Sequence, residues 1–284
     1  MLAQARRRIV RRITSHERGR ALVEWWNHRQ TQAYLLSYPK CGRTWLRLMI
    51  GKALDEHYRL GVTNPMEIGR MHRLEPRIPR IRVSHDEAFD REPRAPAELE
   101  RSKERYRDKT ILFLVRDPRD VVVSSYFEFS RRRGVFSGTL PEFLRAPRGS
   151  IDTILEYYNI WAENQHVPRR FHLVRYEDLH LAPGDTLQEL LRVAGVDVSR
   201  PAIDAAVEFS AFEKMRKMEA ANAFGSRRLR PGDAEDKESF KTRRGKVRGY
   251  AEYLEPADIE YLDRRVRERL DPFYGSYRDE HPRR

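Results

Sequence analysis

The sequence predicts an α/β fold: a single domain with a central parallel sheet, flanking helices and a P-loop-like phosphate-binding loop. Two observations predict it. Short apolar runs typical of buried strands occur at 33–38, 110–115 and 171–174. Each run ends at a polar turn and is followed by apolar residues at helical spacing. This alternation favours parallel strands that are connected by helices.

The first strand is a run of apolar and aromatic residues that ends at Pro39, and helical spacing follows over 45–54. The clearest strand in the chain, at 110–115, ends in Arg116-Asp117-Pro118. The other elements are expected as follows: a basic helical segment at 1–32, a short strand at 81–83, a surface helix at 90–108, helices at 121–129, 151–164, 185–194, 201–209 and 256–270, and a basic loop at 225–250. No repeat or composition break divides the chain, so we expect one domain at 33–284 behind the N-terminal segment.

Composition narrows the class of protein. The chain of 284 residues has a net charge of +13, with 47 Arg and only 9 Lys, which indicates an anionic ligand or surface. No apolar run reaches the roughly 18 residues that a membrane span needs. The basic N-terminus lacks the apolar stretch of a secretory signal. The single cysteine, Cys41, excludes an internal disulfide, so we expect a cytoplasmic location.

Three segments have the chemistry of anion binding. The loop from Tyr38 to Trp45 leads from a strand into a helix, where free N–H groups and the helix dipole favour a phosphate. Its glycine spacing differs from GxxxxGK[ST]. Arg116 and Ser124 stand at the end of the second clear strand and in the helix after it. The third segment, 242–250, combines two glycines with Arg and Lys in an order that favours a flexible anion clamp.

Taken together, these segments resemble the cytosolic-type sulfotransferase family, whose donor is 3′-phosphoadenosine 5′-phosphosulfate (PAPS). Tyr38-Pro-Lys-Cys-Gly-Arg-Thr-Trp45 is similar to the family's 5′-phosphosulfate loop, and Arg116 with Ser124 to its 3′-phosphate site. Arg243-Arg-Gly245 is similar to its C-terminal clamp. Tyr176-Glu-Asp-Leu179 and Ser210-Ala-Phe-Glu-Lys-Met215 resemble two further family segments, and all five occur in family order.

The resemblance implies a role for each matching residue. His85 follows the short strand as the family's general base does, and an imidazole suits proton transfer near neutral pH. Lys40 would stabilise the leaving group, and Ser124 completes the catalytic set. Asp86 and Glu87 are candidates to orient His85. The expected donor-binding residues are Lys40, Cys41, Gly42, Arg43, Thr44, Trp45, Arg116, Ser124, Tyr176, Ser210, Phe212, Arg243, Arg244 and Gly245.

Within that set, Trp45 and Phe212 are expected to stack on the two faces of the adenine, with Ser210 near its edge. Thr44 is expected to hold the 5′-phosphate. No metal is implied, because metal-ligand spacings of His and Cys are absent.

Three residues depart from the family pattern. Cys41 replaces a small Ser or Ala, Arg43 replaces a Thr, and Val83 stands where the family often has a Lys. A thiol at a helix N-terminus among basic residues is expected to have a lowered pKa and to be reactive.

Two other functions fit parts of the sequence. A small-molecule kinase of P-loop type would bind ATP with Mg²⁺, but Arg43 stands where such a loop needs a lysine. A basic nucleic-acid-binding module would explain the charge, although no helix-turn-helix or zinc motif supports it, so no nucleic-acid partner is expected. The expected acceptor is a small-molecule alcohol or phenol, and the N-terminus is a candidate for weak membrane contact. The sequence leaves the acceptor's identity and the oligomeric state open.

Overall fold

A four-stranded parallel sheet forms the centre of the computed structural model, which describes residues 17–86, 88, 92–225, 229–230, 232–233 and 235–279. The strands are β1 (Ala33–Ser37), β2 (Ile81–Ser84), β3 (Thr110–Val115) and β4 (Arg170–Arg175), in the order β2-β1-β3-β4. In the register, Ala33 pairs with both Ile81 and Thr110. All strands therefore end at the same edge, which confirms the expected fold class.

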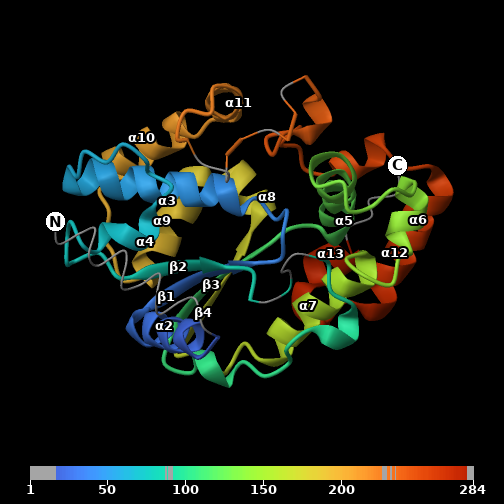
Figure 1. Ribbon diagram of the computed structural model, residues 1–284, viewed down its shortest axis with the longest axis horizontal. Helices are drawn as coiled ribbons and strands as arrows, with labels where there is room; N and C mark the ends of the chain where they lie inside the picture. The colour runs from blue at the N-terminus through green and yellow to red at the C-terminus, as the bar shows by residue number, and fades with distance from the viewer. Residues whose placement is uncertain are drawn as a thin grey trace.

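Helices cover both faces of the sheet (Figure 1). On one face lie α3 (Arg43–Tyr58), α9 (Pro183–Val193) and α10 (Arg200–Phe209). On the other lie α2 (Glu17–Gln30) and α7 (Ile151–Glu163), whose Trp161 ring lies 5.3 Å from that of Phe113. Both central strands are buried along their whole length, which explains their continuous apolar sequence.

The remaining helices lie around the sheet and in the C-terminal part of the domain. They are α4 (Ile68–Met71), α5 (Pro118–Phe127), α6 (Leu140–Leu144), α8 (Tyr176–Leu181), α11 (Phe212–Ala220), α12 (Pro256–Arg269) and α13 (Gly275–Asp279). Short 3₁₀ turns occupy Pro96–Glu98, Glu104–Tyr106, Lys237–Ser239, Gly249–Glu252 and Pro272–Tyr274, and a π-turn, Glu128–Arg132, extends α5. No helix within the described ranges combines the length and hydropathy of a membrane span.

The structure differs from expectation at residues 90–108 and at helix α11, and the short helices α4, α6, α8 and α13 were not expected either. The prediction of a surface helix over 90–108 is wrong for the described residues 92–108. They hold only the two 3₁₀ turns at Pro96–Glu98 and Glu104–Tyr106. Pro93 and Pro96 lack the N–H that a helix interior requires. Helix α11, in contrast, was not expected, because its sequence is mostly polar. Of the expected N-terminal helical segment, α2 lies in the described chain and residues 1–16 lie outside it.

Candidate active site

The carboxyl ends of all four strands open into one cavity. Lys40 follows β1, His85 follows β2, Arg116 follows β3 and Tyr176 follows β4, and all four line it. This is the edge at which open parallel sheets bind ligands. The expected site residues on the wall of this cavity are Lys40, Gly42, Arg43, Thr44, Trp45, His85, Arg116, Ser124, Tyr176, Phe212, Arg243, Arg244 and Gly245.

The loop between β1 and α3 is built for close approach of its backbone to a ligand. Gly42 has φ 91°, and a Cβ atom there would lie 2.5 Å from Cδ2 of Tyr176. Lys40 also has a positive φ, of 73°, a conformation that side chains other than glycine adopt at a cost. Gly42 caps α3 without a side chain, so the helix N-terminus faces the cavity with its N–H groups.

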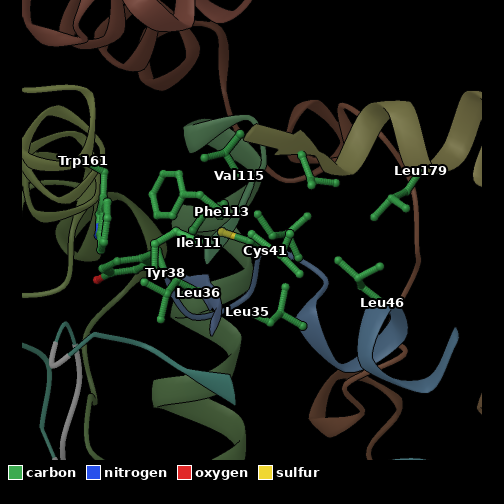
Figure 2. Close-up of a cluster of buried hydrophobic side chains, with 14 of the residues drawn as sticks. Leu35, Leu36, Tyr38, Cys41, Leu46, Ile111, Phe113, Val115, Trp161 and Leu179 are labelled. Carbon is green, nitrogen blue, oxygen red and sulfur yellow. The ribbon is translucent and has the colours of Figure 1, made fainter. Parts of the chain in front are cut away.

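Cys41 lies in this loop but, like Tyr38, does not line the cavity. Its side chain is fully buried, and Figure 2 shows the sulfur among core residues such as Ile111 and Phe113. The thiol contacts the hydroxyl of Tyr158 at 3.3 Å. Burial raises the pKa of Cys41 to about 12, so the expectation of a reactive thiolate is wrong. The helix dipole and nearby arginines do not compensate for the loss of water.

Lys40 is bound to a carboxylate that the sequence analysis did not single out. Its Nζ lies 3.0 Å from Oε2 of Glu128, the first residue of the π-turn after α5. Arg132 and Arg133 approach the other oxygen of Glu128 at 3.6 and 3.0 Å. Burial opposes ionisation of Glu128, but these cations, Lys40 foremost, lower its pKa to about 2. Burial also lowers the pKa of Lys40, against the attraction of Glu128.

Arg116 has the features of an anion-binding group. Its Nη2 donates to the carbonyl of Lys246 at 2.8 Å and lies 3.2 Å from Oδ2 of Asp120. The guanidinium stands over the ring of Tyr176, 4.3 Å from its centroid. Its Nε is buried without a hydrogen-bond partner among the described residues, which leaves one donor available to a ligand. Ser124 lines the same part of the cavity from α5.

The 243–245 segment closes the cavity from the C-terminal side. Gly245 has φ 61°, and a Cβ there would lie 2.4 Å from Cδ2 of Phe212, so only glycine fits against this ring. Arg243 pairs with Glu238 at 3.1 Å, and Arg244 pairs with Glu252 at 2.5 Å. Both arginines therefore exchange a carboxylate partner if they bind an anion.

The buried carboxylate of Glu219 holds the start of that segment. Its oxygens accept hydrogen bonds from the N–H groups of Lys241 and Thr242, at 2.7 and 2.9 Å. Lys241 lines the cavity, and burial, with Arg132 and Lys40 nearby, lowers its pKa to about 7. Sequence reasoning missed Lys241, because a lysine in a basic loop carries no signal of burial.

The residues expected around an adenine ring are only partly brought together. Trp45 lines the cavity with its ring centroid 4.9 Å from that of His180, and His180 packs on Tyr176 at 4.6 Å. Phe212 lies on the wall as well. Ser210 does not, because its hydroxyl is buried and donates to the carbonyl of Ala206. This placement corrects the expectation that Ser210 lies at the edge of the adenine.

His85 is held in one orientation by two neighbours. Its Nδ1 lies 2.9 Å from the carbonyl oxygen of Ser37, which can only accept, so Nδ1 bears the proton and Nε2 bears the lone pair. Arg43 lies against that lone pair, with Nη2 at 2.5 Å from Nε2. Burial, and then the charge of Arg43, lower the pKa of His85 well below its usual value. The imidazole is therefore neutral at pH 7.

Asp86 does not orient His85, contrary to one expectation. Its carboxylate accepts from the hydroxyl of Tyr106 at 2.6 Å and pairs with Lys103 at 2.8 Å, in the protein interior. The other candidate, Glu87, lies outside the described residues. Within the described chain, no group of three His, Cys, Asp or Glu side chains is placed to hold a metal ion.

The fold is thus an open α/β sheet with one cavity at its strand ends, and this cavity is lined by residues from all three segments that were expected to bind anions. A family model for the sulfotransferase domain matches residues 30–273. The chain belongs to the sulfotransferase family, and so it is a PAPS-dependent sulfotransferase, as its motifs predicted.

The curated relatives have low sequence identity to this chain, but they align with most of its length. The chain is 23% identical to cytosolic sulfotransferase 17 of Arabidopsis thaliana over 271 residues, 87% of this chain and 76% of the relative. It is 25% identical to human sulfotransferase 2A1, over 68% of this chain and 70% of the relative. At this level of identity, the relatives do not identify the acceptor.

Solved structures share the fold. Mouse sulfotransferase SULT7A1, complexed with PAP, superposes with a TM-score of 0.62 at 20% identity, over 89% of this chain and 90% of that one. Retinol dehydratase, in complex with androsterone and inactive cofactor PAP, superposes with a TM-score of 0.58 at 16% identity, over 90% and 82%.

Proposed function

We propose that this protein transfers a sulfuryl group from PAPS to a hydroxyl of a small-molecule alcohol or phenol, with His85 as the general base. The observation that carries the proposal is the assembly of the site. Four strand ends and the 243–245 segment bring the phosphate loop, Arg116 and His85 into one cavity. This is the arrangement that in-line transfer between a nucleotide and an acceptor requires.

The residues on the wall fit the two phosphates of the donor. The α3 N-terminus, Thr44 and Lys40 would hold the 5′-phosphosulfate, where the backbone at Gly42 leaves no room for a side chain. Arg116 and Ser124 would hold the 3′-phosphate, and the buried, unpartnered Nε of Arg116 supports this assignment. Arg243, Arg244 and Gly245 would cover it from the C-terminal side, and Trp45 and Phe212 would contact the adenine. PAP in the two similar structures supports this choice of nucleotide.

The chemistry assigned to the chain's own residues is proton transfer and charge stabilisation. The acceptor oxygen forms a bond to sulfur as the bond from sulfur to the bridging oxygen breaks. The acceptor's proton passes to Nε2 of His85, whose Nδ1–H stays bonded to Ser37. The departing phosphate gains the negative charge, and Lys40 stabilises it once its ammonium leaves Glu128.

We further propose that residues 33–284 form the catalytic domain and that the N-terminal segment, 1–32, makes weak contact with anionic membrane surfaces. Helix α2 supports this contact, because Leu22, Trp25 and Trp26 are each more than half exposed. Exposed tryptophans near arginines are typical of helices that lie on a membrane surface. A cytoplasmic location is proposed as well, in keeping with the names of the Arabidopsis relatives.

Radiolabelled PAPS and a panel of alcohols and phenols test the proposed reaction, with product identified by mass spectrometry. We expect label to reach a hydroxyl, and His85→Ala to lower turnover by about 10²–10⁴-fold while PAP binding is retained. His172→Ala is the matched control, since His172 lies on β4 away from the cavity. Near-native turnover by His85→Ala with an identified acceptor would remove His85 as the base.

A further inference from the structure

Arg43 occupies a place that its position in the phosphate loop did not predict. It is the first residue of α3, between Gly42 and Thr44, yet its guanidinium extends across the cavity to the end of β2. There Nη1 donates to the carbonyl of Ser84, and Nη2 lies 2.5 Å from Nε2 of His85. The side chain thus connects the proposed donor loop directly to the proposed base.

In the hydrogen bond between Arg43 and His85, the donor and the acceptor can be assigned. A guanidinium only donates hydrogen bonds, so it donates to Nε2. Because Nδ1 is protonated toward Ser37, Nε2 carries the imidazole's only free lone pair. This is the lone pair that would take the acceptor's proton. While Arg43 is in place, His85 cannot act as a base.

The charged groups that face His85 reinforce this state. Arg43 from α3, Lys241 from the segment before the 3₁₀ turn Gly249–Glu252, and Arg133 after the π-turn are all basic. Each disfavours a second proton on the imidazole, and Arg43 does so most strongly. Removal of Arg43 alone would therefore release the lone pair and lift the largest charge effect.

The bound donor would offer the Arg43 guanidinium an anionic partner in place of His85. A guanidinium binds the oxygens of a sulfo or phospho group bidentately, with charge-assisted hydrogen bonds. Arg43 starts at the loop that would hold the 5′-phosphosulfate, so its side chain can reach either that group or His85. PAP keeps the 5′-phosphate but lacks the transferred sulfuryl group, so a cap that this group releases would respond to PAPS more than to PAP.

On the basis of the proposed function, we infer that Arg43 is a positioning residue that caps His85 in the free enzyme and releases it when the sulfuryl group of the donor arrives. The base would then be free only in donor-loaded enzyme. A bound acceptor would not be deprotonated before a sulfuryl group is present to receive it. The family pattern has Thr at this position, which has no guanidinium, so this contact with His85 is a feature of this chain and not of the family pattern.

NMR of the imidazole nitrogens in ¹⁵N-histidine-labelled protein tests this inference without an activity assay. In the free enzyme, we expect the Nδ1–H tautomer and no protonation of His85 near pH 6.5. Arg43→Thr should raise the pKa of His85 by about one unit or more. In the wild type, PAPS should shift the Nε2 resonance and raise this pKa, and PAP should do so clearly less.

Arg133→Thr is the matched control, because it removes another charge that lowers the pKa of His85 and leaves the contact between Arg43 and Nε2 in place. The inference is overturned if Arg43→Thr moves the His85 pKa no more than Arg133→Thr does, or if PAP and PAPS have equal effects. Arg43→Gln replaces Arg43→Thr should the latter fail to fold. These outcomes are separate from the base assignment. Near-native turnover by His85→Ala would reject the base and leave the observed contact intact.

Discussion

Cys41 and Gly42 are neighbours in the phosphate loop, but they face different environments. Gly42 lies at the cavity against Tyr176, whereas Cys41 is buried in the core beside Tyr158. Spacing in the sequence predicted the loop correctly and the thiol incorrectly, because a turn alternates its side chains between ligand and core. The direction in which each side chain of the loop points is fixed by its packing in the folded protein, and a sequence motif does not show this packing.

Cys41 is therefore expected to be inert in the native protein. Its thiol is buried and its pKa is raised to about 12, so little thiolate forms at pH 8. Titration with a thiol-specific chromophore should give slow labelling in buffer and one equivalent at once in denaturant. Rapid stoichiometric labelling of folded protein would show that the loop exposes the thiol.

His85 is expected to make stability depend on pH. Its pKa is lowered in the folded protein, so the unfolded chain binds the proton more readily between the two pKa values. The resulting stability is fully present above about pH 6.5, the unfolded value, and is lost as pH falls toward the lower folded value. Thermal unfolding midpoints of the wild type should drop between pH 7 and 5 by more than those of His85→Gln.

His57, which forms a hydrogen bond with Ser199 and lies outside the cavity, gives the control variant His57→Gln. It should keep the wild-type pH dependence. Equal slopes for the wild type and His85→Gln would contradict the buried, neutral state of His85.

At the scale of elements, the strands were predictable and the helices between them only in part. β1 and β3 are buried on both faces, so their sequences are continuous apolar runs with clear ends. Helices α7, α9, α10 and α12 matched their expected positions within about two residues. Helix α11 was missed because its few buried residues, among them Met215 and Glu219, give no clear apolar stripe.

Helix α2 carries a prediction of its own. Leu22, Trp25 and Trp26 are exposed, and the Arg29 guanidinium stands 5.6 Å from the Trp25 ring centroid. Sedimentation with vesicles of phosphatidylglycerol and phosphatidylcholine should capture the wild type at low salt and release it as salt rises. Trp25→Ala/Trp26→Ala should bind less.

Leu181→Ala is the matched control for the vesicle experiment, because Leu181 is an exposed apolar residue on α8, outside the N-terminal segment. It should sediment as the wild type does. Equal binding by the double tryptophan variant and the wild type would contradict a membrane role for α2.

At the scale of the whole molecule, the site is built from segments far apart in the chain. Residues 38–45 and 116–124 meet because parallel strands end at one edge of the sheet, and 243–245, which follow no strand, close the cavity from the C-terminal side. That rule, applied to the sequence, was enough to locate the part of the cavity wall that the ends of the strands form. The contacts of Lys40 with Glu128 and of Arg43 with His85 were not predictable, because they depend on where long side chains reach after folding.

The central claim, that this cavity binds the PAPS nucleotide, is tested most directly by isothermal calorimetry with PAP in buffer that contains EDTA. We predict clear binding without metal. Arg116→Ala should weaken it by tenfold or more, roughly the loss of one charge-assisted contact. Arg145→Ala, which removes an arginine remote from the cavity, should bind PAP as the wild type does. Absence of PAP binding, together with Mg²⁺-dependent binding of ATP, would contradict the account.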